Sequence, residues 1–297
     1  FTHNLRYSMI TKSGQTFDPI PLFNFIKNSD KRIRDHAEET IKLMFERIPR
    51  KGDIDLANNK FKYTLLDGIC DPNPNSKRIS TEILVQLEKD APATILPWII
   101  EGLNDPNYDK KIPILETLIK ADKEFINKIP INVLFPLIKD TEWHTKYYAI
   151  MVLSRIPNLS LNYISLAEFE HLLQDSDYKV QEETLKFLVK SPKKFPLALV
   201  IEKLRHPNKN VRAAAAFSLQ GINIEDLDSS TVNQLISLMN DPNKEVRAQI
   251  FITITKIGNF KKYFIPIKPF LDGLLDPNEA VRNSAIKALE KYHNEYY

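Results

Sequence analysis

Glycine is scarce in this 297-residue chain: it occurs seven times, and no two glycines are closer than 15 residues. This spacing excludes every Gly-rich phosphate-binding loop, because such loops need several glycines within a few residues. It also excludes the Gly-x-Ser-x-Gly turn that presents the nucleophile of many hydrolases. The sequence therefore contains no common motif for nucleotide binding or for a serine nucleophile.

Cysteine is almost absent as well. Cys70 is the only one, so no disulfide forms within the chain, and we expect a cytoplasmic protein, or a nuclear one if the source is eukaryotic. Uninterrupted apolar stretches such as Ala149 to Leu153 are far shorter than the roughly 20 residues of a membrane-spanning helix. The 41 Lys and Arg residues against 38 Asp and Glu give a net charge of +3, which is too small for a polyanion-binding tail.

Metal-ligating patterns are missing too. The six histidines lie too far apart for a helical metal pair, and Cys70 has no second cysteine with which to form a zinc site. Two pairs of nearby carboxylates, Asp53 with Asp55 and Asp226 with Asp228, lack the glycine bend and the distal glutamate of a calcium loop. We therefore expect no metal and no cofactor, and interpret these acids as helix caps and solvated loop residues.

The sequence does contain a repeated phrase. Its three clearest copies lie 35 residues apart and read His206-Pro-Asn-Lys-Asn-Val-Arg212, Asp241-Pro-Asn-Lys-Glu-Val-Arg247 and Asp276-Pro-Asn-Glu-Ala-Val-Arg282. Weaker copies begin earlier in the chain, at Asn28, Asp71, Asp105, Asp140 and Asp175. Self-similarity at such a period is typical of repeat architectures. We infer eight repeats over about residues 17 to 292.

Each repeat is predicted to form two helices, joined by this phrase. Before the phrase, a segment that starts at Ser229 or Ser230 as its N-cap and ends at Met239 has apolar residues at helical spacing. After the phrase, Val246, Ile250 and further apolar residues fall on one face of a second helix. Proline ends the first helix, and the Asn or Asp that follows caps the second. We call the two helices A and B.

An Asp-Pro turn followed by Val-Arg and a helix rich in small residues resembles the HEAT repeat family. The resemblance spans nearly the whole chain and is carried best by repeats 6 to 8. It implies an all-α protein, an α-solenoid of about eight HEAT-like helix pairs, with A helices on the convex side and B helices lining the concave side. We expect residues 1–16 to be an N-terminal extension and residues 17–297 to form a single HEAT-repeat solenoid domain.

The resemblance also implies a ladder between adjacent repeats, in which the aspartate that begins one phrase pairs with the arginine that ends another. The ladder residues in this sequence are Arg212, Asp241, Arg247, Asp276 and Arg282. Other repeats carry a cation at the arginine position, namely Arg34, Lys77, Lys111 and Lys146. For this column of cations we favour the ladder over a ligand-binding stripe.

The solvent side of helix B is unusual in the middle repeats. Two, six and nine residues after the position of Val246, the first and last repeats carry polar residues such as Asp35 and Lys287. The middle repeats carry apolar residues, which we expect to line the concave face and bind a partner: Ile112, Ile119, Tyr147, Met151, Phe217 and Ile252. Packing of these side chains against neighbouring B helices is the alternative interpretation.

Three functions remain open at this point. The leading hypothesis is a non-catalytic scaffold or adaptor that binds a partner protein along the concave face, because the chain is a repeat array without a catalytic constellation. The alternative is a nucleic-acid-binding HEAT subunit of a chromosome-organising or DNA-repair assembly, based on an isoelectric point of about 8.7 and the column of cations. Third, the segment around Trp143 resembles HEAT-like DNA alkylation-repair glycosylases, although such a tryptophan is more often a core anchor.

Overall fold

The computed structural model describes residues 19–46, 59–106, 108–157, 159, 164–190, 195–222 and 227–296. Every regular element in these residues is a helix, and they contain no strand. The protein is all-α, an α-solenoid of HEAT-like helix pairs, as the sequence predicts. No helix in the described ranges is both long enough and apolar enough to cross a bilayer.

The chain divides into two compact units, Phe1–Asn158 and Leu159–Tyr297. Each unit contains four of the eight predicted repeats. The single solenoid domain over residues 17–297 therefore stays a prediction, and the predicted extension over residues 1–16 lies outside the described residues.

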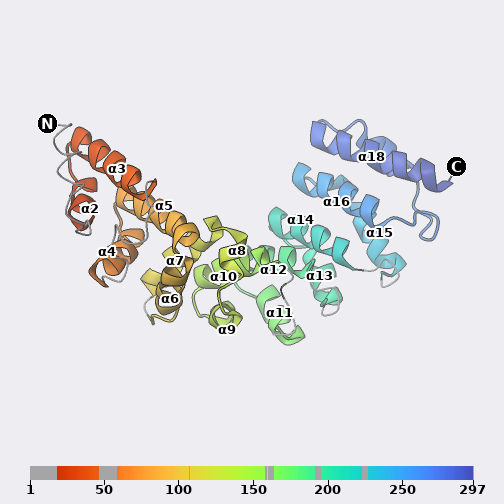
Figure 1. The fold of residues 1–297 in the computed structure, drawn as a ribbon. Coiled ribbons are helices and arrows are strands. Elements are labelled where there is room, and N and C mark those ends of the chain that lie inside the picture. The colour runs from red at the N-terminus through yellow and green to blue at the C-terminus, as the bar shows by residue number, and fades with distance from the viewer. Residues whose placement is uncertain are drawn as a thin grey trace. The chain divides into compact units, whose positions relative to one another are not determined.

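Unit 1 contains repeats 1 to 4 (Figure 1). Their helices are, in A and B order, α2 (Ile20–Ile26) and α3 (Lys31–Glu46), α4 (Asn59–Ile69) and α5 (Pro74–Asp90), α6 (Pro92–Leu103) and α7 (Tyr108–Lys120), and finally α9 (Ile131–Leu134) with its 3-10 continuation η1 (Phe135–Lys139) and α10 (Trp143–Arg155). A short helix that the sequence analysis did not predict, α8 (Lys123–Ile126), precedes α9 and is capped by the side chain of Asp122.

Unit 2 contains repeats 5 to 8 (Figure 1). Their helices are α11 (Leu166–Leu173) and α12 (Tyr178–Leu188), α13 (Leu197–Lys203) and α14 (Lys209–Ser218) with η4 (Leu219–Gly221), α15 (Ser229–Ser237) with η6 (Leu238–Asn240) and α16 (Lys244–Ile257), and α17 (Lys268–Gly273) and α18 (Glu279–Tyr296). Consecutive B helices pack on one another, α12 on α14, α14 on α16 and α16 on α18, and each A helix packs on its own B helix.

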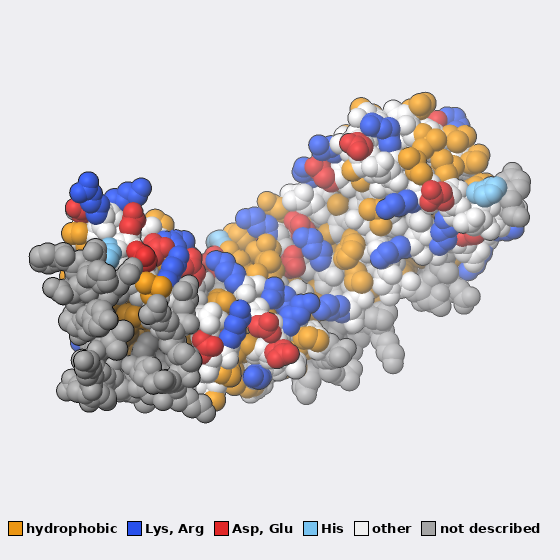
Figure 2. Space-filling model, turned by 45° about the horizontal axis from the view of Figure 1, so that its top comes forward, with side chains coloured by type: hydrophobic (Ala, Val, Ile, Leu, Met, Phe, Trp, Pro, Cys, Tyr) orange, Lys and Arg blue, Asp and Glu red, His pale blue; other side chains and the backbone are white. Residues whose placement is uncertain are grey.

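The core of each unit comes from the apolar stripes of these helices. The Val positions of repeats 6 to 8, Val211, Val246 and Val281, are fully buried, which is the outcome expected for the inward side of an amphipathic helix. Aromatic rings join the last two repeats, since Phe251 of α16 lies with its ring centroid 6.2 Å from that of Phe270 of α17. Outside the core, cations and anions intermingle over the surface that Figure 2 presents.

The predicted start of one A helix is wrong by a residue. We expected Ser229 or Ser230 to cap the A helix of repeat 7, whereas Ser229 is the first helical residue and Asp228 is the N-cap. The Asp228 carboxylate accepts a hydrogen bond of 2.7 Å from the backbone N–H of Thr231. Both residue types cap helices well, so composition alone does not choose between neighbouring caps.

Gly221 marks a close approach between repeats 5 and 6. A Cβ at this position would lie 2.8 Å from the Cα of Val189 and 2.9 Å from its carbonyl oxygen. Because these are backbone atoms at the end of α12, they cannot move aside as a flexible side chain could. The absence of a side chain at Gly221 therefore sets the distance between the two repeats.

Replacing Gly221 by alanine is expected to lower the free energy of unfolding by about 1–3 kcal/mol, the usual cost of overpacking. Chemical denaturation followed by circular dichroism measures this change. The exposed Asn283→Ala of α18 serves as a control and should stay within about 0.5 kcal/mol of wild type. Equal stability of Gly221→Ala and this control would contradict the close approach, because it would show that the two repeats accommodate the added methyl group without loss of stability.

Candidate functional site

The turn between helices A and B is the most regular feature of the molecule. Its first residue accepts a hydrogen bond from the backbone N–H two residues later, as Asp241 does from Asn243 at 2.8 Å. The side chain of that third residue then caps helix B, as Asn243 does by accepting from the N–H groups of Glu245 and Val246. The same pair of bonds occurs at Asp276 and Asn278. Capping of helix B by the Asn of the repeated phrase is confirmed.

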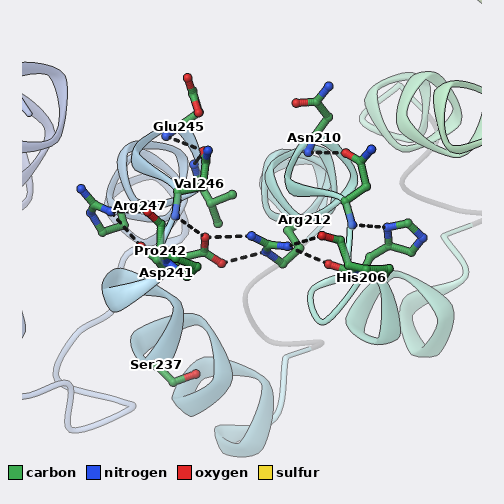
Figure 3. Close-up of polar contacts among 12 residues, drawn as sticks. His206, Asn210, Arg212, Ser237, Asp241, Pro242, Glu245, Val246 and Arg247 are labelled. Carbon is green, nitrogen blue, oxygen red and sulfur yellow. Dashed lines mark hydrogen bonds and ion pairs between the residues drawn. The ribbon is translucent and has the colours of Figure 1, made fainter.

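Arginine connects this turn to the next one, as Figure 3 shows for Arg212. One side of its guanidinium donates to the Asp241 carboxylate, from Nε at 2.7 Å and from Nη2 at 2.9 Å. Nη1 donates to the backbone carbonyls of His206 and Pro207 in the turn of its own repeat. A single side chain therefore closes one turn and joins it to the following repeat through a bidentate pair.

Arg247 repeats this arrangement one step further on. It binds the Asp276 carboxylate at 2.7 and 3.0 Å, and Nη1 donates to the carbonyls of Asp241 and Pro242. Hydrogen bonding from Arg247 lowers the pKa of Asp276. Arg282 binds the carbonyls of its own turn through Nη1, and among the described residues its Nε and Nη2 have no partner.

Earlier repeats keep only parts of the ladder. Lys111 reaches Asp140 at 3.5 Å, whereas Lys77 pairs with Glu116 of α7 at 2.7 Å. Arg34 donates to two carbonyls of its own turn, like the arginines of unit 2. Most cations of the column are thus held by carboxylates or carbonyls within the fold, which leaves less positive charge for a polyanion.

The step from repeat 5 to repeat 6 lacks charge. Gln181 stands at the arginine position and donates to the carbonyl of Asp175 at 2.6 Å. His206 stands at the aspartate position, and its Nδ1 accepts the turn hydrogen bond from the N–H of Asn208. Burial, together with Lys203 and Arg212, lowers the pKa of His206, so the imidazole is neutral near pH 7.

The side chains two, six and nine residues after the Val position form what we call the B-helix face. The structure places five of the six predicted partner-binding residues at half-buried positions and leaves Ile252 40% exposed. Four of them are on α7 and α10 of unit 1, and two are on α14 and α16 of unit 2. The half-buried residues are Ile112, Ile119, Tyr147, Met151 and Phe217.

Charged residues occur on this face in more repeats than the first and the last, which were the only ones expected to be polar. In unit 1, an ion network spans α3 and α5 and consists of Glu38, Lys42, Arg78 and Glu82, with contacts of 2.6 to 3.3 Å. In unit 2, Lys186 of α12 pairs with Glu182 at 2.7 Å and with Glu183 at 3.3 Å. The apolar part of the face is therefore confined to α7 and α10 in unit 1 and to α14 and α16 in unit 2.

A polar connection lies among the apolar residues of unit 1, because Glu116 occupies the position of the B-helix face between Ile112 and Ile119. The Tyr148 hydroxyl of α10 donates to Glu116 of α7 at 2.9 Å, and Glu116 also binds Lys77. Burial and this hydrogen bond raise the pKa of Tyr148 to about 12. Trp143, the basis of the glycosylase hypothesis, is half-buried at the start of α10, with its ring centroid 3.5 Å from that of His144.

Comparison with known proteins identifies the C-terminal repeats. The family model of HEAT repeats matches residues 197–290. This part of the chain is a HEAT array. None of the curated proteins matches the chain.

Solved structures agree with the helical-repeat fold. The chain is similar to the crystal structure of an engineered protein, with a TM-score of 0.54, 13% identity, and coverage of 93% of this chain and 78% of that one. It is also similar to the X-ray structure of YibA of Escherichia coli, with a TM-score of 0.58, 15% identity, and coverage of 92% and 93%. At these identities the likeness shows the fold alone.

One carboxyl in unit 1 is unusual. Glu88, near the end of α5, is 2% exposed, and neither of its carboxyl oxygens has a hydrogen-bond partner. Burial raises its pKa to about 8, while the positive charge of Lys89 acts in the opposite direction and the negative charge of Asp122 adds to the rise. Among the described residues, no three His, Cys, Asp or Glu side chains cluster as metal ligands would.

Glu88 should make the stability of the protein fall as the pH rises. Its pKa is near 4.5 in the unfolded chain and about 8 in the folded one, so the unfolded state loses its proton first. The free energy of unfolding of Glu88→Gln should therefore equal that of wild type near pH 4.5 and exceed it by up to about 3 kcal/mol at pH 7. Urea unfolding across this pH range tests the prediction, with the exposed Glu124→Gln as control. Parallel curves for Glu88→Gln and wild type would contradict the raised pKa.

Arg247 and Arg282 differ in one contact, the ion pair with the aspartate of the next repeat, and their substitution tests the ladder. Arg247→Met removes a bidentate ion pair and leaves the Asp276 carboxylate without it, whereas Arg282→Met removes only bonds to carbonyls of its own turn. We expect Arg247→Met to lower the free energy of unfolding by about 1–3 kcal/mol more than Arg282→Met does. Denaturant unfolding in dilute solution gives both values. Equal costs would show that the ion pair adds nothing to the stacking of repeats 7 and 8.

Proposed function

We propose that this chain is a non-catalytic scaffold of the cytoplasm that binds a partner protein through the B-helix face. HEAT repeats commonly serve as protein-interaction scaffolds and are in general non-catalytic, which supports the proposal. The observation that carries it is the pair Phe217 and Ile252, which keep solvent-accessible apolar surface on two adjacent B helices. Apolar groups placed together at the surface of a soluble fold favour an interaction site.

The surroundings of this pair describe the segment that would bind. Ala213 and Ala248 stand one turn before Phe217 and Ile252 on α14 and α16, and their small side chains leave room for a partner's apolar anchor. The neighbouring B helices, α12 and α18, carry charges of both signs at the same positions of the face. These features fit an amphipathic helix or extended segment whose apolar side chains are flanked by charged ones.

The apolar residues of unit 1 provide a second contact region of the same kind. Ile112 and Ile119 are on α7, Tyr147 and Met151 are on α10, and these two helices pack together. Aromatic and methionine side chains are common in protein interfaces, because they offer large apolar contact areas and adapt their shape. We propose that a partner engages the two units through separate segments.

The test is capture of partners by wild type and by the double variant Phe217→Asp, Ile252→Asp, with bound proteins quantified by mass spectrometry. Two buried charges at the contact should reduce capture of a specific partner at least about tenfold, which corresponds to 1.4 kcal/mol. Circular dichroism verifies that the array stays folded. Retention of every partner by the variant would refute the B-helix face of unit 2 as the binding site.

The matched control replaces one phenylalanine and one aliphatic residue elsewhere in the same unit. Phe264→Asp, Leu275→Asp replaces two residues that are 87% and 85% exposed and that flank α17, and it should leave capture unchanged. Equal loss in both double variants would show that capture is merely nonspecific. Capture of duplex DNA instead, with an affinity that falls steeply with salt, would establish the nucleic-acid alternative.

A further inference from the structure

Each B helix of the HEAT array presents one side to the repeat that follows. On α16 this side consists of Arg247, Phe251 and Ile254, which are spaced four and three residues apart and so share one face of the helix. Repeat 8 contacts two of the three: Arg247 binds Asp276, and Phe251, which is 1% exposed, packs on Phe270. The side of α16 that faces repeat 8 therefore combines a cation with buried apolar contacts.

The corresponding side of α18 is open. The positions 35 residues further on are Arg282, Ile286 and Leu289. Ile286 is 44% exposed, Leu289 is half-buried, and the Nε and Nη2 groups of Arg282 have no partner in the described part of the chain. Repeat 8 thus carries the residues of an internal stacking face on a side that the described residues leave partly exposed.

Exposed apolar residues concentrate in this repeat. Of the eleven large hydrophobic residues that are exposed in the described part of the chain, five belong to it: Phe264, Ile267, Leu271, Leu275 and Ile286. Figure 2 shows hydrophobic side chains gathered at the end of the molecule where α18 lies. Exposed apolar side chains gathered in one region of a folded protein indicate that something covers them.

The charges of α18 identify what covers it. Arg282 and Glu290 lie four residues before and four residues after Ile286, on the same side of the helix. Neither the carboxylate of Glu290 nor the outer edge of the Arg282 guanidinium is paired within the described residues. When two such helices cross antiparallel at Ile286, each Arg282 faces the partner subunit's Glu290. The helix is therefore complementary to a second copy of itself.

We propose that the protein forms a homodimer through α18. The two α18 helices run antiparallel, Ile286 packs on the partner subunit's Ile286, and Arg282 pairs with the partner subunit's Glu290 twice, once on each side of the two-fold axis. The antiparallel arrangement also sets the N-terminus of each helix beside the C-terminus of the other, which their dipoles favour. Such an isologous interface closes the assembly at two chains.

Sedimentation of the whole chain over about a hundredfold range of concentration tests this proposal. Wild type should shift from monomer to dimer, and Ile286→Asp should stay monomeric throughout. Glu290→Arg and Arg282→Glu each set like charges opposite one another, so each should weaken dimerisation at least about tenfold. The double variant restores opposite charges and should return to within about threefold of wild type.

The controls separate the interface from folding and from general effects of surface charge. Glu290 also belongs to the B-helix face, so Lys287→Glu changes the neighbouring charge of that face and should leave the dimer unchanged. Thermal unfolding verifies that each variant folds, and Glu290→Arg, an exposed surface change, decides the matter if Arg282→Glu does not fold. The proposal would be overturned if wild type stayed monomeric, or if the double variant dimerised as weakly as the two single variants.

Discussion

The turn between the two helices of a repeat is the constraint on which the rest of the structure depends. Its first side chain holds the backbone two residues later, its third side chain starts helix B, and arginine binds both the carbonyls of the turn and the next aspartate. The acceptor lies 29 residues after the donor at Arg212 and at Arg247 alike. Local chain geometry and the distance between repeats are therefore fixed by the same few atoms.

Most of the fold was predictable because this turn has a strong sequence signal. Proline, a capping Asn or Asp, and apolar residues at helical spacing locate both helices of nearly every repeat. The short helix α8 escaped prediction because four residues, of which Phe125 and Ile126 are buried, show no periodicity. The N-cap at Asp228 was missed because two serines beside it have a similar capping tendency.

The candidate site was predictable in position but not in extent. Spacing placed Phe217 and Ile252 on the same side of their helices, yet their exposure depends on neighbouring helices that no local pattern describes. The same holds for Glu88, which looks like an ordinary charged residue near the end of a helix until its surroundings are known. Pairing within the fold also makes the column of cations less available to a ligand, since Arg212 and Arg247 already have carboxylate partners.

The neutral step between repeats 5 and 6 gives the HEAT array interfaces of two electrostatic kinds. With Gln181 and His206 in place of the arginine and the aspartate, this interface has no ladder ion pair, because both side chains make neutral hydrogen bonds within their own turns. The next two interfaces add ion pairs, which dissolved salt screens in proportion to their exposure. Ionic strength therefore acts on the three interfaces of unit 2 unequally, and the order in which they loosen depends on the salt content of the surrounding solution.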